Sequence, residues 1–193
     1  MFLYASFKLV RYKIKKGIKM KKIMLIAVML LPFAANATPL TGFYQTVDDE
    51  INKPKSIVAL YECKNEDKTN LCGRIIALYD LETGKISETL NKPVRVADNV
   101  KGAPKMAGLD ILWDMEWDED DMEYSGGRIM DPKKGSIYRS VIWQEENEPT
   151  KLRVRGKIGP FGRTQTWNVM KKSDLPKDLQ KLDISKWEVV VIK

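Results

Sequence analysis

The sequence predicts an all-β fold, in which antiparallel strands either close into a barrel or stack as a sandwich. Apolar and polar residues alternate in several segments; in 152–158, for example, Leu152 and Val154 oppose Arg153 and Arg155. Segments rich in turn-forming residues separate these stretches, as in 131–135 and 159–162. Eight or nine such strands in about 150 residues would leave exposed edges in an open sheet, so we expect closure or stacking.

Residues 1–37 have the features of a cleavable signal peptide. The basic residues Lys21 and Lys22 precede an apolar run at 23–33, and Ala35 and Ala37 follow it at the spacing of a cleavage site. This run is about half of the ~20 residues that a membrane-spanning helix needs, so we expect no stable membrane anchor. The sequence therefore predicts a translation start at Met20, cleavage after residue 37, a periplasmic location and a single domain over 38–193.

The candidate strands follow one another along the exported part. They cover 42–48, 56–63, 72–79, 109–117, 124–131, 136–144, 151–158 and 163–170, with a ninth at 187–192. Segment 80–108 has scattered Gly and Pro residues and is expected to be a long loop with short structure around 86–97. Residues 173–182 begin with a Ser cap and carry Leu175, Leu179 and Leu182 at helical spacing, which predicts a short C-terminal helix.

Cys63 and Cys72 are the two cysteines of the chain and flank a polar stretch between two candidate strands. Export to an oxidising compartment permits a disulfide. A bridge between them would hold this hairpin together. We therefore predict a Cys63–Cys72 disulfide and no metal site built on these thiols.

The charge of the chain gives no support for a nucleic-acid partner. Of the 33 Lys and Arg residues, eight lie in 1–37, which leaves 25 bases against 26 acids in the exported part. The positive net charge therefore resides in the leader, which has eight bases and no acid, and the remainder has a charge of −1. The absence of histidine excludes Ser-His, Cys-His and His-metal sites.

Other chemical groups have plain structural interpretations beside functional ones. The acidic cluster at 114–123 lacks the Gly and Glu spacing of a calcium loop and is interpreted as a solvated hairpin tip. Two carboxylates in a cleft could serve a hydrolase, which remains a low-ranking alternative. The tryptophans of the strands are core residues or the wall of a ligand cavity. Arg153 and Arg155 share one face, either outward for solubility or inward to clamp an acidic group.

An ordered series of short motifs resembles an exported bacterial family, domain of unknown function 2147. The motifs are Asp48-Asp49, Ser56-Ile-Val58, Gly126-Gly-Arg-Ile-Met-Asp-Pro132 with Gly135 and Tyr138, Leu152-Arg-Val-Arg-Gly156 and Gly162-Arg-Thr-Gln-Thr-Trp167. The resemblance implies a lipocalin-like antiparallel β-barrel of eight or nine strands, with no established activity. The family usually opens with Gly-x-Trp, whereas Gly42-Phe43-Tyr44 places Tyr at the Trp position here.

The leading functional hypothesis is a periplasmic carrier or sensor that holds a small, largely apolar ligand inside the barrel and needs no cofactor. A hydrophobic or acidic lipid-like molecule fits this description. The candidate ligand-binding residues are Trp113, Tyr138, Trp143, Arg155 and Arg163. The main alternative is an envelope scaffold whose barrel is filled by side chains and which binds a protein partner. A hydrolytic enzyme is the second alternative.

Overall fold

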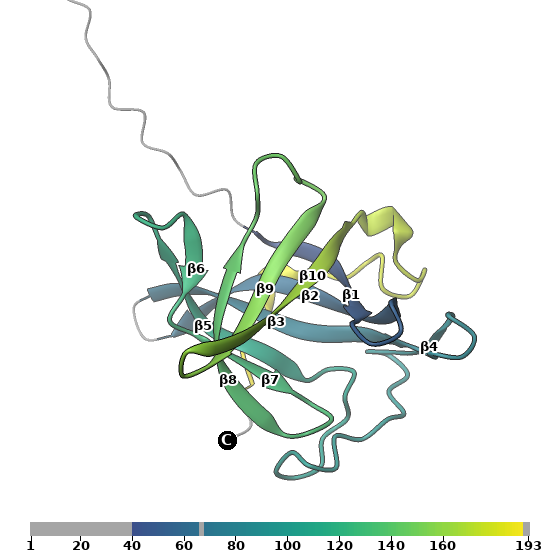
Figure 1. Ribbon diagram of the computed structural model, residues 1–193. Helices are drawn as coiled ribbons and strands as arrows, with labels where there is room; N and C mark the ends of the chain where they lie inside the picture. Colours follow the sequence, from purple (N-terminus) through teal and green to yellow (C-terminus); the bar gives the residue numbers. More distant parts are fainter. Residues whose placement is uncertain (1–39, 66–67, 191–193) are drawn as a thin grey trace, which may run out of the picture. The chain divides into compact units, whose positions relative to one another are not determined.

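The computed structural model of the chain describes residues 40–65 and 68–190, which belong to one compact unit at 36–193 (Figure 1). The predicted signal peptide lies outside the described residues. The strands are β1 (Gly42–Asp48), β2 (Lys53–Asn65), β3 (Lys68–Tyr79), β4 (Ile86–Thr89), β5 (Asp110–Asp118), β6 (Glu123–Ser125), β7 (Arg128–Asp131), β8 (Ser136–Trp143), β9 (Lys151–Ile158) and β10 (Phe161–Met170). No described helix is long and apolar enough to span a membrane.

The strands close into an antiparallel barrel with eight strand positions around its wall. Consecutive strands pair from β8 to β10 and from β1 to β3, the first strand pairs with the last, and β3 pairs with β5 to close the ring. Both β6 and β7 lie between β5 and β8, so these two short strands together fill one strand position of the barrel. Strand β4 adds to the edge of β3 outside the ring. The expectation of an antiparallel lipocalin-like barrel is confirmed.

The alternation of side chains along β5 is interrupted. Asp114 has a φ of 57°, and the register with β3 shifts between Leu71 and Gly73. The bulge fits against Gly127, where a Cβ atom would lie 2.4 Å from the carbonyl oxygen of Trp113. A glycine is therefore required at Gly127, between the end of β6 and the start of β7.

The core has an inner and an outer part because β2 and β3 are buried on both faces. Val58 and Leu60 belong to the cluster that fills the barrel, whereas Ile57 and Ala59 face outward. The outward side chains are covered by the C-terminal segment 171–190, drawn in yellow in Figure 1. Two faces of burial explain why β2 reads as an almost continuous apolar run.

The predicted C-terminal helix is wrong. Residues 173–182 contain only the end of a 3₁₀ turn at Lys172–Asp174, and another 3₁₀ turn follows at Ile184–Lys186. Leu175 is extended, with φ −69° and ψ 156°, because the residue before a proline is excluded from the helical region and Pro176 comes next. Leu179 is nevertheless fully buried, so the leucines pack on the barrel wall as expected without a helix. Residues 187–190 form no strand, and 191–192 lie outside the described part.

Cys63 and Cys72 form a disulfide, as predicted, with Cα atoms 5.8 Å apart. It joins β2 and β3 near the turn that connects them, at the closed end of the barrel. The acidic residues after Asp118 form the exposed turn between β5 and β6 at the same end. The opposite end carries the turns that follow β1, β3, β7 and β9.

Candidate ligand-binding site

A cavity of about 660 Å³ opens at the end of the barrel opposite the disulfide. The ends of β1, β3, β7 and β9 and the starts of β2, β8 and β10 contribute its wall, and part of loop 90–109 lies beside it. The volume is typical of sites that enclose a small molecule. The half of the barrel nearer the disulfide is filled by side chains, so the cavity occupies only the half at the opposite, open end.

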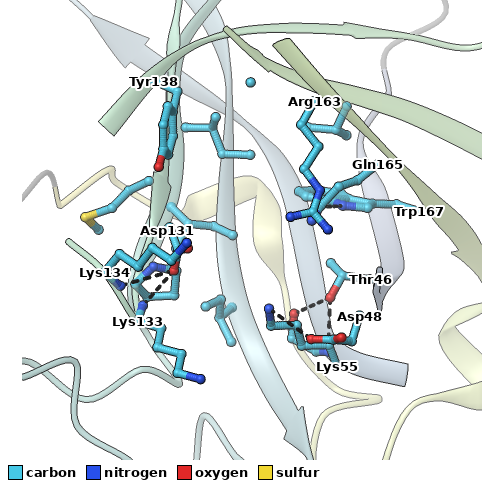
Figure 2. Close-up of a pocket in the computed structure, with 18 of the residues that line it drawn as sticks. Thr46, Asp48, Lys55, Asp131, Lys133, Lys134, Tyr138, Arg163, Gln165 and Trp167 are labelled. Atoms are coloured by element: carbon cyan, nitrogen blue, oxygen red, sulfur yellow. Dashed lines mark hydrogen bonds and ion pairs between the residues drawn. The ribbon is translucent and has the colours of Figure 1, made fainter. Parts of the chain in front are cut away.

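The floor and lower walls of the cavity are apolar. On β9, Val154 and Gly156 point inward by alternation, and Gly156 leaves room that a side chain would otherwise fill. Trp167 of β10 is 1 % exposed and presents part of its ring to the cavity (Figure 2). Further apolar lining comes from Ile75, Leu78, Met106, Ile111, Ile129 and Met130, and from Ile158 and Phe161 at the mouth.

One side of the cavity carries polar groups that already have partners. The hydroxyls of Thr46 and Ser56 lie 2.7 Å apart and are buried, and the Ser56 N–H donates to the Thr46 oxygen. Asp48 forms an ion pair with Lys55 at 3.4 Å. Burial alone would raise the pKa of Asp48, but the N–H groups of Glu50 and Ile51 together with Lys55 outweigh it and lower this pKa. On this side, the Asp48 carboxylate is therefore held in place and the charge of Lys55 is balanced by it.

The opposite side is basic. Lys133 and Lys134 lie in the turn between β7 and β8 and line the cavity with exposed side chains. The Asp131 carboxylate in this turn accepts the backbone N–H groups of both lysines, at 2.9 and 3.2 Å. Their ammonium groups form no ion pair with any residue in 40–65 or 68–190. Figure 2 shows this turn across the cavity from Arg163.

Arg163 stands at the rim at the start of β10. Its guanidinium pairs with Asp49 at 2.7 Å, and its side chain is 64 % exposed. Asp49 also accepts a hydrogen bond from the Gln165 amide at 2.9 Å, and Gln165 in turn accepts one from the Trp167 indole at 3.3 Å. A chain of hydrogen bonds thus runs from the rim to the floor of the cavity.

Loop 90–109 is fixed at the rim by a buried carboxylate. Glu88 accepts the N–H groups of Val94 and Arg95 at 2.7 and 2.8 Å and pairs with the Arg95 guanidinium. Burial alone would raise the pKa of Glu88, but the hydrogen bond from Arg95 and the two backbone N–H groups lower it. Arg95 and Met106 then line the cavity. Segment 80–108, which was predicted to be a loop with short structure around 86–97, therefore forms part of the site and contains β4.

The structure brings two of the five predicted ligand-binding residues to the cavity, Tyr138 and Arg163. Trp113 is 6 % exposed and packs in the filled half of the barrel. Trp143 pairs with Arg153 across β8 and β9 and alternates with the inward Ile142, so it lies on the outer face.

Arg155 also points outward, because it alternates with Val154 and Gly156, which line the cavity. Its Nε atom is buried near Gly162, and the described residues offer it no hydrogen-bond partner. Arg155 therefore cannot clamp an acidic group inside the barrel in this arrangement.

Sequence reasoning missed Lys133 and Lys134. Segment 131–135 was identified only as a turn, since side chains in turns follow no alternation that would show their direction. One signal could have placed these lysines at the mouth: the turn that carries them connects two adjacent barrel strands, β7 and β8, and therefore lies at one end of the barrel.

Within 40–65 and 68–190, no three His, Cys, Asp or Glu residues are arranged so that they could hold a metal ion, at the cavity or elsewhere. The carboxylates near the mouth have partners in the protein, namely Lys55 for Asp48 and Arg163 for Asp49. What the arrangement offers chemically is an apolar compartment with positive charge at one side of its mouth.

Comparisons with known proteins agree with this fold. A family model described as "Uncharacterized protein conserved in bacteria (DUF2147)" matches residues 42–169. The chain is similar in structure to protein HP1028 from the human pathogen Helicobacter pylori, which is described as belonging to the lipocalin family. The TM-score is 0.52 at 20% identity, over 73% of this chain and 88% of that one. At this identity the likeness shows the fold alone. No curated protein matches the chain.

Proposed function

Since the chain belongs to the bacterial family DUF2147 and folds as a lipocalin-like barrel, we propose that it binds a small, largely apolar molecule with an acidic head group. The observation that carries this proposal is the cavity of about 660 Å³ with an apolar floor and unpaired lysines at its mouth. The apolar part of the ligand would lie against Trp167 and Val154. The acidic head would lie between Lys133 and Lys134 on one side and Arg163 on the other.

The head group follows from the electrostatics of the mouth. The ammonium groups of Lys133 and Lys134 have no acidic partner in the described part of the chain, so an incoming anion would displace only water. Arg163 is already paired with Asp49, and a carboxylate reaching it would have to share the guanidinium. We therefore assign the main anion contact to the two lysines, with Arg163 and the Tyr138 hydroxyl as secondary contacts.

The cavity supports a binding role over a scaffold with a filled interior. A filled barrel would need side chains in the space that Gly156 leaves open, and no side chain of residues 40–65 or 68–190 fills it. Export to the periplasm belongs to the same proposal, and the Cys63–Cys72 disulfide is compatible with it. N-terminal sequencing of the native product should give Thr38; a start upstream of Ile23 would contradict export by cleavage.

Titration with a fluorescent long-chain carboxylate tests the binding proposal. Saturable binding is expected, and Lys133→Gln/Lys134→Gln should weaken it by about tenfold or more, as expected for loss of charge-assisted hydrogen bonds. Arg139→Gln is the matched control, because this exposed arginine lies on the outer face of β8. Native mass spectrometry of the protein from its own cells should also show a retained small molecule. Absence of saturable binding by carboxylate, alcohol and amine analogues alike would refute the proposal.

A further inference from the structure

Two large apolar side chains stand in solvent at the mouth of the cavity. Ile158 ends β9 and is 65 % exposed, and Phe161 begins β10 and is 79 % exposed. The two residues pair across the turn that Gly159 and Pro160 form. Ile137, which is 48 % exposed, lies on the neighbouring strand β8. The β9–β10 tip therefore presents a small apolar point at the barrel's open end.

Basic residues surround this point. Lys133 and Lys134 occupy the neighbouring turn, and Arg139 of β8 pairs in register with Lys157 of β9. Arg163 follows the tip on β10. The turn's own Asp131 is occupied by backbone N–H groups. The β7–β10 side of the mouth thus combines protruding apolar groups with an excess of positive charge.

We propose that the β9–β10 tip docks on the surface of an anionic phospholipid bilayer. Ile158 and Phe161 would enter the interface between head groups and acyl chains, where aromatic and aliphatic side chains are favoured. Lys133, Lys134 and Arg139 would lie against the lipid phosphates, because each basic residue near a negative surface is attracted to it. The cavity mouth lies on the same end, so docking would bring it to the bilayer surface.

The dimensions of the tip favour a bilayer over a protein partner. A stable protein interface buries about 800 Å² on each side around a packed centre. The tip offers two side chains on a narrow turn, which is enough to anchor in a fluid interface but too little for such a centre. The charge around it is also mainly positive, because the basic residues outnumber Asp131 and Asp49, and this excess complements anionic lipid. The docking does not require a ligand in the cavity, so it can be tested independently of the proposed function.

Co-sedimentation with vesicles tests the proposal. The measurement uses the protein as its own cells release it, with the N-terminus sequenced, because the basic residues of a retained leader would bind lipid themselves. Vesicles of phosphatidylethanolamine with phosphatidylglycerol should bind the protein, and vesicles of phosphatidylcholine should bind it much less. Raising the salt concentration should weaken the association, since exposed charges are screened.

Variants locate the contact. Ile158→Ser/Phe161→Ser and Lys133→Gln/Lys134→Gln should each reduce vesicle binding by about tenfold or more. Met122→Ser is the apolar control, since Met122 is 56 % exposed in the turn at the other end of the barrel. Lys177→Gln/Lys181→Gln, on the C-terminal segment, is the charge control. Both controls should bind like the unaltered protein.

Three results would overturn the proposal. These are equal binding to both kinds of vesicle, undiminished binding by the Ile158→Ser/Phe161→Ser variant, and a self-association through the tip that replaces vesicle binding. Circular dichroism and thermal unfolding check that the variants fold; both altered side chains are mostly exposed, so no change is expected. Binding of the fluorescent carboxylate without vesicles is measured in parallel. Its failure with intact vesicle binding would refute the proposed ligand and leave the docking in place.

Discussion

Arg74 of β3 and Asp110 of β5 form a two-point ion pair, with the Nε and Nη2 atoms 2.9 and 2.7 Å from the two carboxylate oxygens. The guanidinium also lies over the ring of Trp187, 4.8 Å from its centroid, and donates to the Glu188 carbonyl. The N–H of Val190 donates to the same carboxylate at 2.8 Å. The pair thereby fastens the end of the C-terminal segment to the closing seam of the barrel.

Asp110→Asn should therefore destabilise the protein and loosen its C-terminal segment. Asp110 is fully buried and Arg74 nearly so, and removing one partner leaves the other charge unpaired; we expect a loss of about 3 kcal/mol in the free energy of unfolding. Urea denaturation measures the loss, and limited trypsin cleavage near Lys186 reports the loosening. Asp98→Asn, at an exposed site, is the control. Equal stability and equal cleavage would show that the pair is not an anchor.

Glu88 should make the rim of the cavity sensitive to acid. Its pKa in the folded protein lies below the ordinary value of 4.5, so its contribution is complete above about pH 4.5 and is lost as the pH falls through the lowered value. Hydrogen exchange of the N–H groups of Val94 and Arg95 should speed up in that range. Glu88→Gln should show fast exchange already at neutral pH. Slow exchange in this variant would contradict the role of the carboxylate.

Loss of the disulfide should cost stability and leave the site intact. Cys63→Ser/Cys72→Ser should lower the free energy of unfolding by roughly 2–3 kcal/mol, because the bridge constrains the unfolded chain. Binding of the fluorescent carboxylate should not change, since the bridge lies at the other end of the barrel. Thiol labelling of the denatured, unreduced native protein should find no free thiol. Two labelled thiols would show that the bridge does not form in the cell.

Gly156→Leu should close the cavity without unfolding the barrel. A Cβ atom at Gly156 would lie 3.5 Å from the Cβ of Tyr138 and 3.6 Å from Ile129, which is ordinary contact, so the rest of a leucine extends into the cavity. Ligand binding should fall by about tenfold or more, and stability should change little. Gly73→Ala is the contrasting variant, because its Cβ would lie 2.8 Å from Leu60. It should lower stability; full binding by Gly156→Leu would place the ligand elsewhere.

Arg155→Ala should leave ligand binding unchanged. The side chain is on the outer face of β9, opposite the residues that line the cavity. The sequence left both directions open for this residue, and an inward arginine would make the same variant lose about tenfold in affinity or more. A titration of the variant beside Lys133→Gln/Lys134→Gln therefore separates the two directions. A loss confined to Arg155→Ala would mean that the ligand binds outside the barrel.

The strands could be predicted because alternation and turn residues are local properties. Eight candidate strands correspond to the barrel strands, with boundaries shifted by a few residues. The bulge at Asp114 could not be predicted, since it depends on the close approach of Gly127 from a neighbouring strand. The helix was predicted from leucine spacing, but Pro176 interrupts it, and the leucines reach the same apolar surface by another path.

The candidate site was predictable only in part, because alternation and turn residues are local properties and most of the site is built by contacts between distant segments. Tyr138 lies on a strand whose alternation fixes its direction once the inner face is known. Lys133 and Lys134 lie in a turn, and the loop that carries Arg95 has no periodicity at all. Such side chains are placed by contacts between distant segments, as Glu88 places Arg95, and these contacts leave no pattern in the sequence.

The pairing of β1 with β10 has a consequence for how the chain folds. Phe43 pairs with Met170, so one edge of the first strand finds its partner only when nearly the whole chain is present, whereas the other edge pairs with β2. Closure between such distant segments costs more loop entropy than a hairpin does, and barrels of this kind fold in milliseconds to seconds. A chain that is synthesised or exported from its N-terminus can pair β1 with β2 early, but it would carry the other edge of β1 unpaired until β10 follows, so this strand edge is the one that a chaperone would protect during delivery.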